Sequence, residues 1–174
     1  MAQLISVTTL WNCNVLLNGT DLLGRMAEFK IPQPKRVMVD YKSLGMAGQI
    51  EVPVGFEKLE TTLKWTSFDA DVLTNINNTN GMTALTFMAD AQVIASTGLI
   101  QDLPVSGNMT VIFKDPGPID LKAQANAEYS SVASVYHIDY SLAGQQILLF
   151  DSLSNQYVVN GVDQLAQYRA NLGA

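Results

Sequence analysis

YSSVASVYHIDYSL, residues 129–142, is rich in valine, isoleucine and tyrosine and alternates over a long span. Successive side chains of a β-strand point to opposite faces, so this alternation is typical of a strand that buries one face. The pattern predicts that one face carries Val132, Ser134, Tyr136, Ile138 and Tyr140. Ala143-Gly144 then turns the chain into a second strand over residues 145–151, which predicts an antiparallel hairpin.

Similar segments occur on the N-terminal side. Residues 11–17 alternate and end in Asn18-Gly19, a pair that favours a tight hairpin because both turn positions need positive φ. Residues 59–66 also alternate, and their predicted buried face carries Leu59, Thr61, Leu63 and Trp65. Further strands are predicted over residues 21–31, 35–41, 49–54, 82–89, 92–100, 108–114 and 157–159, with a hairpin around Asp90 and a turn over residues 104–107.

Two short helices complete the predicted fold. Residues 67–79 carry apolar side chains at helical spacing, with Ser67 as the predicted N-cap and Asn80-Gly81 as the stop. The second helix lies between Gly161 and Gly173. The sequence therefore predicts one mainly β domain over residues 1–174. Its fold is an antiparallel β-sandwich or partly closed barrel, with one short flanking helix, a short C-terminal helix and one long loop.

That long loop is YKSLGMAGQIEVPVG, residues 41–55, which carries no charge from residue 43 to residue 50. Its glycines free the backbone for positive φ, and its apolar side chains have nowhere local to hide. Such a loop either folds back over its own core or docks on another subunit, because exposed apolar patches usually mark contact sites. The second interpretation assigns stacking contacts to Leu44, Gly45, Met46, Ala47, Gly48 and Ile50.

The composition also favours an oligomer. Hydrophobic residues make up 48% of the 174 residues and charged residues only 15%, with a net charge of −6. Because soluble domains carry about 25% charged residues, the deficit indicates subunit faces that are covered by partners. Ten basic residues against sixteen acidic ones, without a basic cluster, exclude a protein that grips nucleic acid by its phosphates. An acidic surface suits a channel that lets DNA pass. We expect neither a membrane span nor a secretory signal.

No catalytic residue, cofactor site or metal site is predicted. His137 is the single histidine and lies within a strand, and Cys13 is the single cysteine and lies in an apolar alternation. Structural roles are favoured for both over a nucleophile–base pair, because a buried strand thiol is inert. The motifs of phosphate-binding loops, dinucleotide folds and zinc proteases are missing from the sequence. The chain is therefore predicted not to be an enzyme.

The C-terminal tail, residues 160–174, reads NGVDQLAQYRANLGA. It resembles the C-terminal signature of the major tail tube proteins of contractile-tailed bacteriophages, the FII family, and of phage-tail-like bacteriocins (tailocins). The matching tail positions are Asn160, Gly161, Val162, Asp163, Leu165, Arg169 and Leu172. Residues 14–19, the glycines of the loop and residues 136–151 resemble the same family. Residues 66–107 match by pattern only, and the family's basic strand is represented here by Lys114 alone.

The resemblance implies a structural protein. Members of this family form hexameric rings of β-sandwich subunits, and the rings stack into a hollow tube inside a contractile sheath. The implied partners are further copies of the chain, the tail sheath protein, and the tail initiator, baseplate and terminator proteins. DNA would pass through the lumen without specific binding, in a virion assembled in the host bacterial cytoplasm. Two alternatives remain: a ring protein of type six secretion, and a monomeric β-sandwich module that binds a ligand through exposed aromatic side chains.

Overall fold

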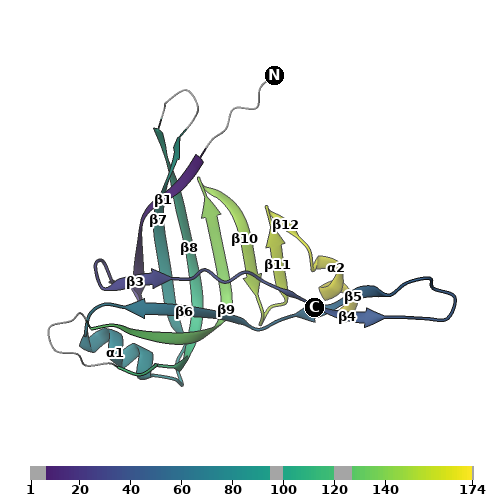
Figure 1. Ribbon diagram of the computed structural model, residues 1–174, viewed down its shortest axis with the longest axis horizontal. Coiled ribbons are helices and arrows are strands. Elements are labelled where there is room, and N and C mark those ends of the chain that lie inside the picture. The colour runs from purple at the N-terminus through teal and green to yellow at the C-terminus, as the bar shows by residue number, and fades with distance from the viewer. Residues whose placement is uncertain (1–6, 95–99, 120–126, 174) are drawn as a thin grey trace.

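Strands that are distant in sequence pair into one large antiparallel sheet (Figure 1). The computed structural model describes residues 7–94, 100–119 and 127–173. Within these residues, the strand order is β12-β11-β10-β9-β8-β7-β1-β2, and β6 joins the sheet by pairing with β9 and β3. The strands of the path are β1 (Val7–Leu17), β2 (Thr20–Asp21), β7 (Thr83–Ile94), β8 (Ile100–Asp115), β9 (Tyr129–Leu142), β10 (Gln145–Asp151), β11 (Gln156–Val159) and β12 (Val162–Asp163).

The core lies where β3 (Met26–Phe29) and β6 (Leu59–Trp65) cross the long strands of the sheet (Figure 1). Leu63 and Trp65 of β6 are buried together with Phe87 of β7 and Phe113 of β8. The indole N–H of Trp65 donates to Ser131 Oγ at 2.9 Å, so the buried polar atom has a partner. The predicted alternation of residues 59–66 is confirmed, and the arrangement is sandwich-like rather than a closed barrel.

A separate two-stranded sheet projects sideways from this body. It consists of β4 (Arg36–Tyr41) and β5 (Ile50–Phe56), joined by residues 42–49. The predicted strands 35–41 and 49–54 are thus confirmed, and they pair with each other. We call this hairpin the arm and residues 42–49 its tip.

The predicted hairpin around Asp90 is wrong, because β7 runs without a break from Thr83 to Ile94 and Asp90 pairs with Pro104 of β8. The predicted turn over residues 104–107 is also wrong, since these residues lie inside β8. Gly107 is needed there for close packing: a Cβ would lie 2.3 Å from the Asp139 carbonyl oxygen and 2.4 Å from the Phe87 ring. The predicted strand 92–100 includes residues 95–99, which lie outside the described residues.

A β-bulge changes the predicted faces of β9. His137 pairs with Thr110 and Val135 with Val111, so two steps along β9 match one step along β8. Val135 and Ile138 are both buried although they are three residues apart. The prediction that Val132, Ser134 and Tyr136 share a face with Ile138 and Tyr140 is therefore wrong, because the core side passes from Ala133 and Val135 to Ile138 across the bulge.

Three further predictions, about a helix cap, the length of a strand and the start of a helix, are wrong. The flanking helix α1 (Ala70–Asn77) begins after Asp69, whose side chain accepts the Asp71 N–H at 3.2 Å, so Asp69 rather than Ser67 is the N-cap. The predicted strand 21–31 is two strands, β2 and β3, separated by a turn in which Gly24 has φ +75°. The C-terminal helix α2 (Ala166–Leu172) ends at Gly173 in the left-handed conformation, as predicted. Its predicted start just after Gly161 is wrong, because Val162–Asp163 form β12 and pair with β11.

Candidate assembly interface

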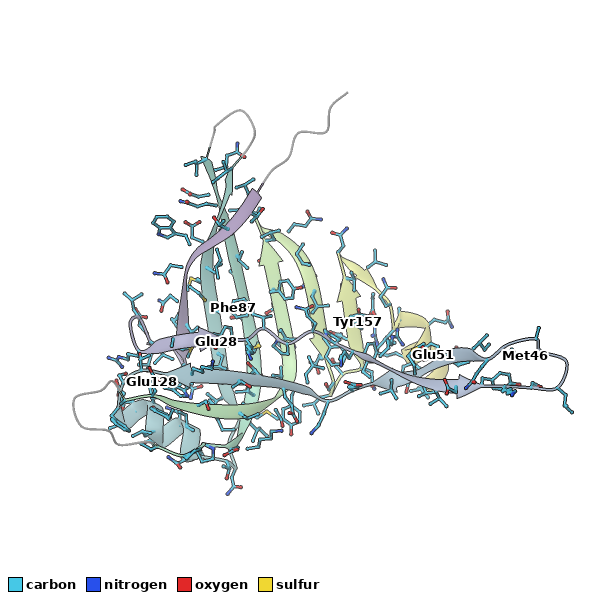
Figure 2. The ribbon with its side chains drawn as sticks, viewed as in Figure 1. Glu28, Met46, Glu51, Phe87, Glu128 and Tyr157 are labelled. Atoms are coloured by element: carbon cyan, nitrogen blue, oxygen red, sulfur yellow. The ribbon has the colours of Figure 1, made fainter. Side chains whose placement is uncertain are left out.

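The arm exposes apolar side chains on both of its strands. It pairs from Arg36↔Phe56 at the base to Tyr41↔Ile50 near the tip. Figure 2 shows Met46 at the far end, away from the body. The exposed apolar residues of its strands are Met38, Val39, Tyr41, Ile50, Val52 and Val54. A two-stranded hairpin with uncovered apolar faces is at best marginally stable alone, so this geometry calls for a covering partner.

A tight turn forms the tip. The Met46 N–H donates to the Ser43 carbonyl oxygen at 3.2 Å, and Gly45 has φ +86°, which is the signature of a type II turn. Leu44 occupies the leading corner of this turn and is 103% exposed, as in an isolated peptide. The loop therefore does not fold back over its own core. The predicted contact residues from Leu44 to Gly48 all lie in the tip, and Ile50 begins β5.

Aromatic packing joins the arm to the body at its base. The Arg36 guanidinium carbon lies 4.3 Å from the Phe56 ring centre and 6.0 Å from that of Tyr157. The Phe56 ring packs edge-on against Phe150 at 5.1 Å and against Tyr157 at 5.0 Å. A cation above aromatic rings is stabilised by their quadrupoles. This contact fixes the direction in which the arm leaves the body.

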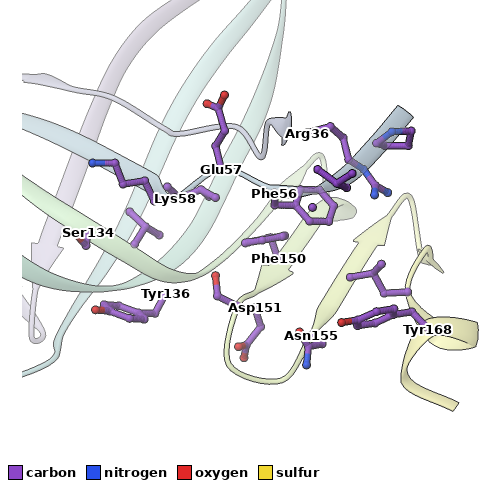
Figure 3. Close-up of a pocket in the computed structure, with 17 residues that line it drawn as sticks. Arg36, Phe56, Glu57, Lys58, Ser134, Tyr136, Phe150, Asp151, Asn155 and Tyr168 are labelled. Carbon is purple, nitrogen blue, oxygen red and sulfur yellow. The ribbon is translucent and has the colours of Figure 1, made fainter. Parts of the chain in front are cut away.

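A pocket of about 760 Å³ opens beside this base (Figure 3). Its walls come from the arm, β9, β10, the turn after β10 and α2. Phe56 and Phe150 contribute apolar surface, and Tyr168 of α2 approaches from the other side. The charged lining residues balance, with Arg36 and Lys58 against Glu57 and Asp151. Such a neutral, partly apolar hollow fits a neutral, partly apolar partner.

Asp151 holds the turn after β10, residues 152–155. Its carboxylate accepts the N–H groups of Leu153 at 2.8 Å and Ser154 at 3.0 Å, and it lies 3.4 Å from His137 Nδ1. Burial raises the pKa of Asp151, but these hydrogen bonds outweigh it and leave the pKa below its usual value. His137 thus contacts a structural turn, in line with its predicted structural role.

The predicted tail residues form a compact unit. Asn160-Gly161 makes the tight turn between β11 and β12 with positive φ at both residues. Asp163 accepts the Leu165 N–H at 2.9 Å and binds the Arg169 guanidinium, which also donates to the Asn155 carbonyl oxygen at 2.9 Å. The hydrogen bond from Arg169 is the main cause of the lowered pKa of Asp163. Asp163 and Arg169 therefore fasten α2 to the turn after β10.

The apolar side chains of the tail stay uncovered. In the described chain, α2 buries none of its residues, and Val162 and Leu172 are each 62% exposed. These two residues do not anchor the tail within the subunit, so any contact they make is with another molecule. Leu165 is half-buried and lines the pocket.

A further exposed feature, which the sequence did not predict, is the outer edge of β1. In the described residues, β1 pairs with β7 along its length but with β2 only at Leu16 and Leu17. Beyond these residues, Val15 accepts the Leu22 N–H at 3.0 Å, and within the described chain no second strand pairs with the outer edge of the first half of β1. Leu10 and Trp11 lie beside it, and Trp11 is 72% exposed. The pocket residues Arg36, Phe56, Phe150 and Tyr168 were likewise not predicted.

The model of the family "Phage tail tube protein FII" matches residues 7–173 of this chain. The chain belongs to the phage tail tube protein FII family. The resemblance found in the sequence is thereby confirmed, and this family is one of structural tube proteins rather than enzymes. Among curated proteins, the tail tube protein of Escherichia phage P2 is 24% identical over 165 residues, which cover 92% of this chain and 94% of the relative.

Solved structures share the fold of this tube protein. One chain of the sheath/tube terminator of an extracellular contractile injection system, PVC, aligns with a TM-score of 0.54 and 10% identity, covering 75% of this chain and 94% of the other. A chain of the PVC sheath-tube complex aligns with a TM-score of 0.51 and 12% identity, covering 74% and 87%.

Over residues 7–94, 100–119 and 127–173, no group of His, Cys, Asp and Glu side chains is arranged to hold a metal ion. Burial raises the pKa of the Cys13 thiol, which keeps it protonated and inert. Neither helix in the described part of the chain is long and apolar enough to span a membrane.

Proposed function

We propose that this chain is the subunit of a tail tube in which hexameric rings stack into a hollow tube within a contractile sheath. The observation that carries the proposal is the arm, because it presents the fully exposed Leu44 within an uncharged run, residues 43–50, together with uncovered apolar strands. A surface of this kind is stabilised when further copies of the chain cover it. The family match makes a tube the natural product of that self-association.

The free edge of β1 supports closure into a ring. In the part of the chain that the structure describes, the first half of β1 has no strand beside its outer edge at one end of the sheet, and the short strands β11 and β12 lie at the other end. Backbone pairing between such edges of neighbouring copies would satisfy their free N–H and C=O groups. A contact between two different surfaces closes into a ring when the rotation between copies is a fraction of a full turn. Edge pairing therefore forms the ring, and the arms contact neighbouring copies or the next ring.

One face of the sheet suits the passage of DNA. Register places Asn108 beside Thr86 and Asp139, and Asp90, Asp102 and Ser106 lie on the same face. β1, β7 and β9 contain no lysine or arginine, and the one basic residue of β8, Lys114, is held by Glu60 at 2.5 Å. A face without free cations cannot neutralise phosphates, so DNA would slide past it without binding. We assign this face to the lumen.

The implied partners follow from this arrangement. Sheath subunits would cover the outside of the tube, and initiator, baseplate and terminator proteins would cap its ends. The protein would be assembled in the cytoplasm of a host bacterium and would act in the virion during DNA ejection. The ring of a type six secretion system shares this assembly logic, and the cargo rather than the subunit contacts would distinguish the two.

Negative-stain electron microscopy of the purified protein over a concentration series tests the proposal. Rings or hollow tubes that lengthen with concentration are expected. A monomer that stays dispersed at high concentration, also when a tail initiator complex is added, would argue for a monomeric binding module instead.

A further inference from the structure

We propose that the pocket at the base of the arm is a socket for the arm tip, residues 42–49, of a second copy of this chain. The inference rests on the proposed self-assembly and adds the site at which the tip docks. The tip and the pocket lie at opposite ends of the arm, and their chemical properties are complementary.

The tip has the chemistry of an inserted segment. Leu44 stands at the corner of a turn closed by the bond from Met46 to Ser43, so its side chain is presented on a defined backbone. No part of the described subunit covers Leu44. Lys42 at the base of the tip is its one charged residue, and residues 43–49 carry no charge, so burying the turn around Leu44 desolvates no ion.

The pocket has the matching chemistry. Phe150 is buried at its floor and Leu165 is half-buried, whereas Tyr168 remains 51% exposed on its wall. The two positive and two negative lining residues cancel, so the site favours neither an anion nor a cation. Its volume of about 760 Å³ is in the range of sites that enclose a small ligand or a few side chains. Occupation would also cover α2, which buries none of its residues in the described chain.

Geometry requires the two surfaces to come from different copies. The paired part of β4 runs from Arg36, which lines the pocket, to Tyr41 next to the tip. At about 3.3 Å per residue, a straight hairpin carries the tip about 16 Å beyond Arg36 and away from the pocket, so the tip cannot enter the pocket of its own subunit. A tip in a socket is therefore a head-to-tail contact, which leaves each copy with a free tip and a free socket. Such a contact repeats and generates rings or stacks.

Disulfide trapping between single-cysteine variants tests this assignment. All variants carry Cys13→Ser, so that each has one thiol. Leu44→Cys in the tip is mixed with Ser152→Cys, an exposed serine that lines the pocket and whose replacement is nearly isosteric. The matched control mixes Leu44→Cys with Leu23→Cys, an exposed position in the turn before β3. One variant of each mixture carries an affinity tag, and oxidised heterodimers are counted by gel electrophoresis.

We expect at least a tenfold faster heterodimer formation for the Ser152→Cys mixture than for the Leu23→Cys mixture. Equal rates overturn the socket assignment. Equal rates together with wild-type tubes in electron micrographs mean that the tube proposal stands and the tip docks elsewhere. Equal rates with no assembly by wild-type protein contradict both proposals. Selective cross-linking that is unchanged by added sheath protein excludes a sheath segment as the natural occupant, and competition by sheath protein contradicts the self-docking assignment.

Discussion

The Arg36 guanidinium carbon lies 4.3 Å from the centre of the Phe56 ring, across the first residue pair of the arm. Phe56 in turn packs against Phe150 and Tyr157 of the body. Arg36 thus stacks on the ring through which the arm contacts strands of the body that lie about a hundred residues further along the sequence. Arg36 helps to set the direction of the arm but does not belong to the tip. We therefore expect it to influence assembly only indirectly, by positioning the arm.

Arg36→Gln is expected to loosen the arm while leaving the body folded. The lost cation–π contact is worth about 0.5–1 kcal/mol at a partly exposed site. Hydrogen exchange of β4 and β5 amides should speed up, and assembly should need a higher protein concentration. Lys35→Gln is the control, because its ion pair with Glu57 at 3.6 Å is exposed and contributes little. Equal exchange rates in both variants would show that Arg36 does not hold the arm.

Met46→Asp is expected to give a folded subunit that assembles poorly. The half-buried Met46 lies in the uncharged run of residues 43–50, and docking would place the new carboxylate in an apolar site at a cost of several kcal/mol. Circular dichroism should match the wild type, and electron microscopy should show few or short tubes. Met46→Leu preserves the apolar contact and should assemble normally. Tubes of normal length from Met46→Asp would rule out a contact role for the tip.

Gly107→Ala should destabilise the body by about 1–3 kcal/mol, as overpacking does. The added methyl group would lie within 2.7 Å of the Asp139 carbonyl oxygen, the Phe87 ring and the Tyr140 Cβ. Gly48→Ala is the matched control, since nothing lies within 4 Å of a Cβ at that position. Denaturant unfolding of both variants measures the difference. A Gly107→Ala variant as stable as Gly48→Ala would mean that β8 and β9 are packed less closely than described.

Glu60 should titrate far below an ordinary glutamate. Hydrogen bonds from Lys114 and then Lys58 lower the pKa of Glu60 to about 2. Because the folded pKa lies below the unfolded value of about 4.3, the stability from this contact is full above that value and is lost as the pH falls towards 2. An NMR titration of the Glu60 carboxyl carbon should give the low pKa in wild type and a higher one in Lys114→Ala. The same pKa in both proteins would contradict the assigned partner.

The parts of the fold that follow from local patterns were predictable. Asn18-Gly19 and Asn160-Gly161 form the tight turns that their backbone preferences favour, and Leu63 and Trp65 are buried as the alternation indicates. The β9 bulge was not predictable, because the alternation continues through Tyr136 and His137 and only the pairing with β8 reveals the extra residue. Gly107 was mistaken for a turn residue because close packing and a turn both select glycine.

The candidate interface likewise has a part that the sequence predicted and a part that it did not. The missing charge and paired glycines of the tip identified it, since those features are local. The pocket was hidden because Arg36, Phe56, Phe150 and Tyr168 come from distant segments that only the fold brings together. The sequence pattern of the tail was misleading as well. The spacing of Val162 and Leu172 suggests side chains that pack on one face of a helix, but both remain exposed in the single subunit.

A cryo-electron-microscopy reconstruction of particles assembled from the wild-type protein, on a tail initiator complex if needed, tests the central claim most directly. The account predicts rings of six subunits whose arms lie on neighbouring copies, with Asp90 and Asp139 facing a hollow lumen. Rings in which the arms project into solvent, or in which basic residues rather than these carboxylates line the lumen, would contradict it.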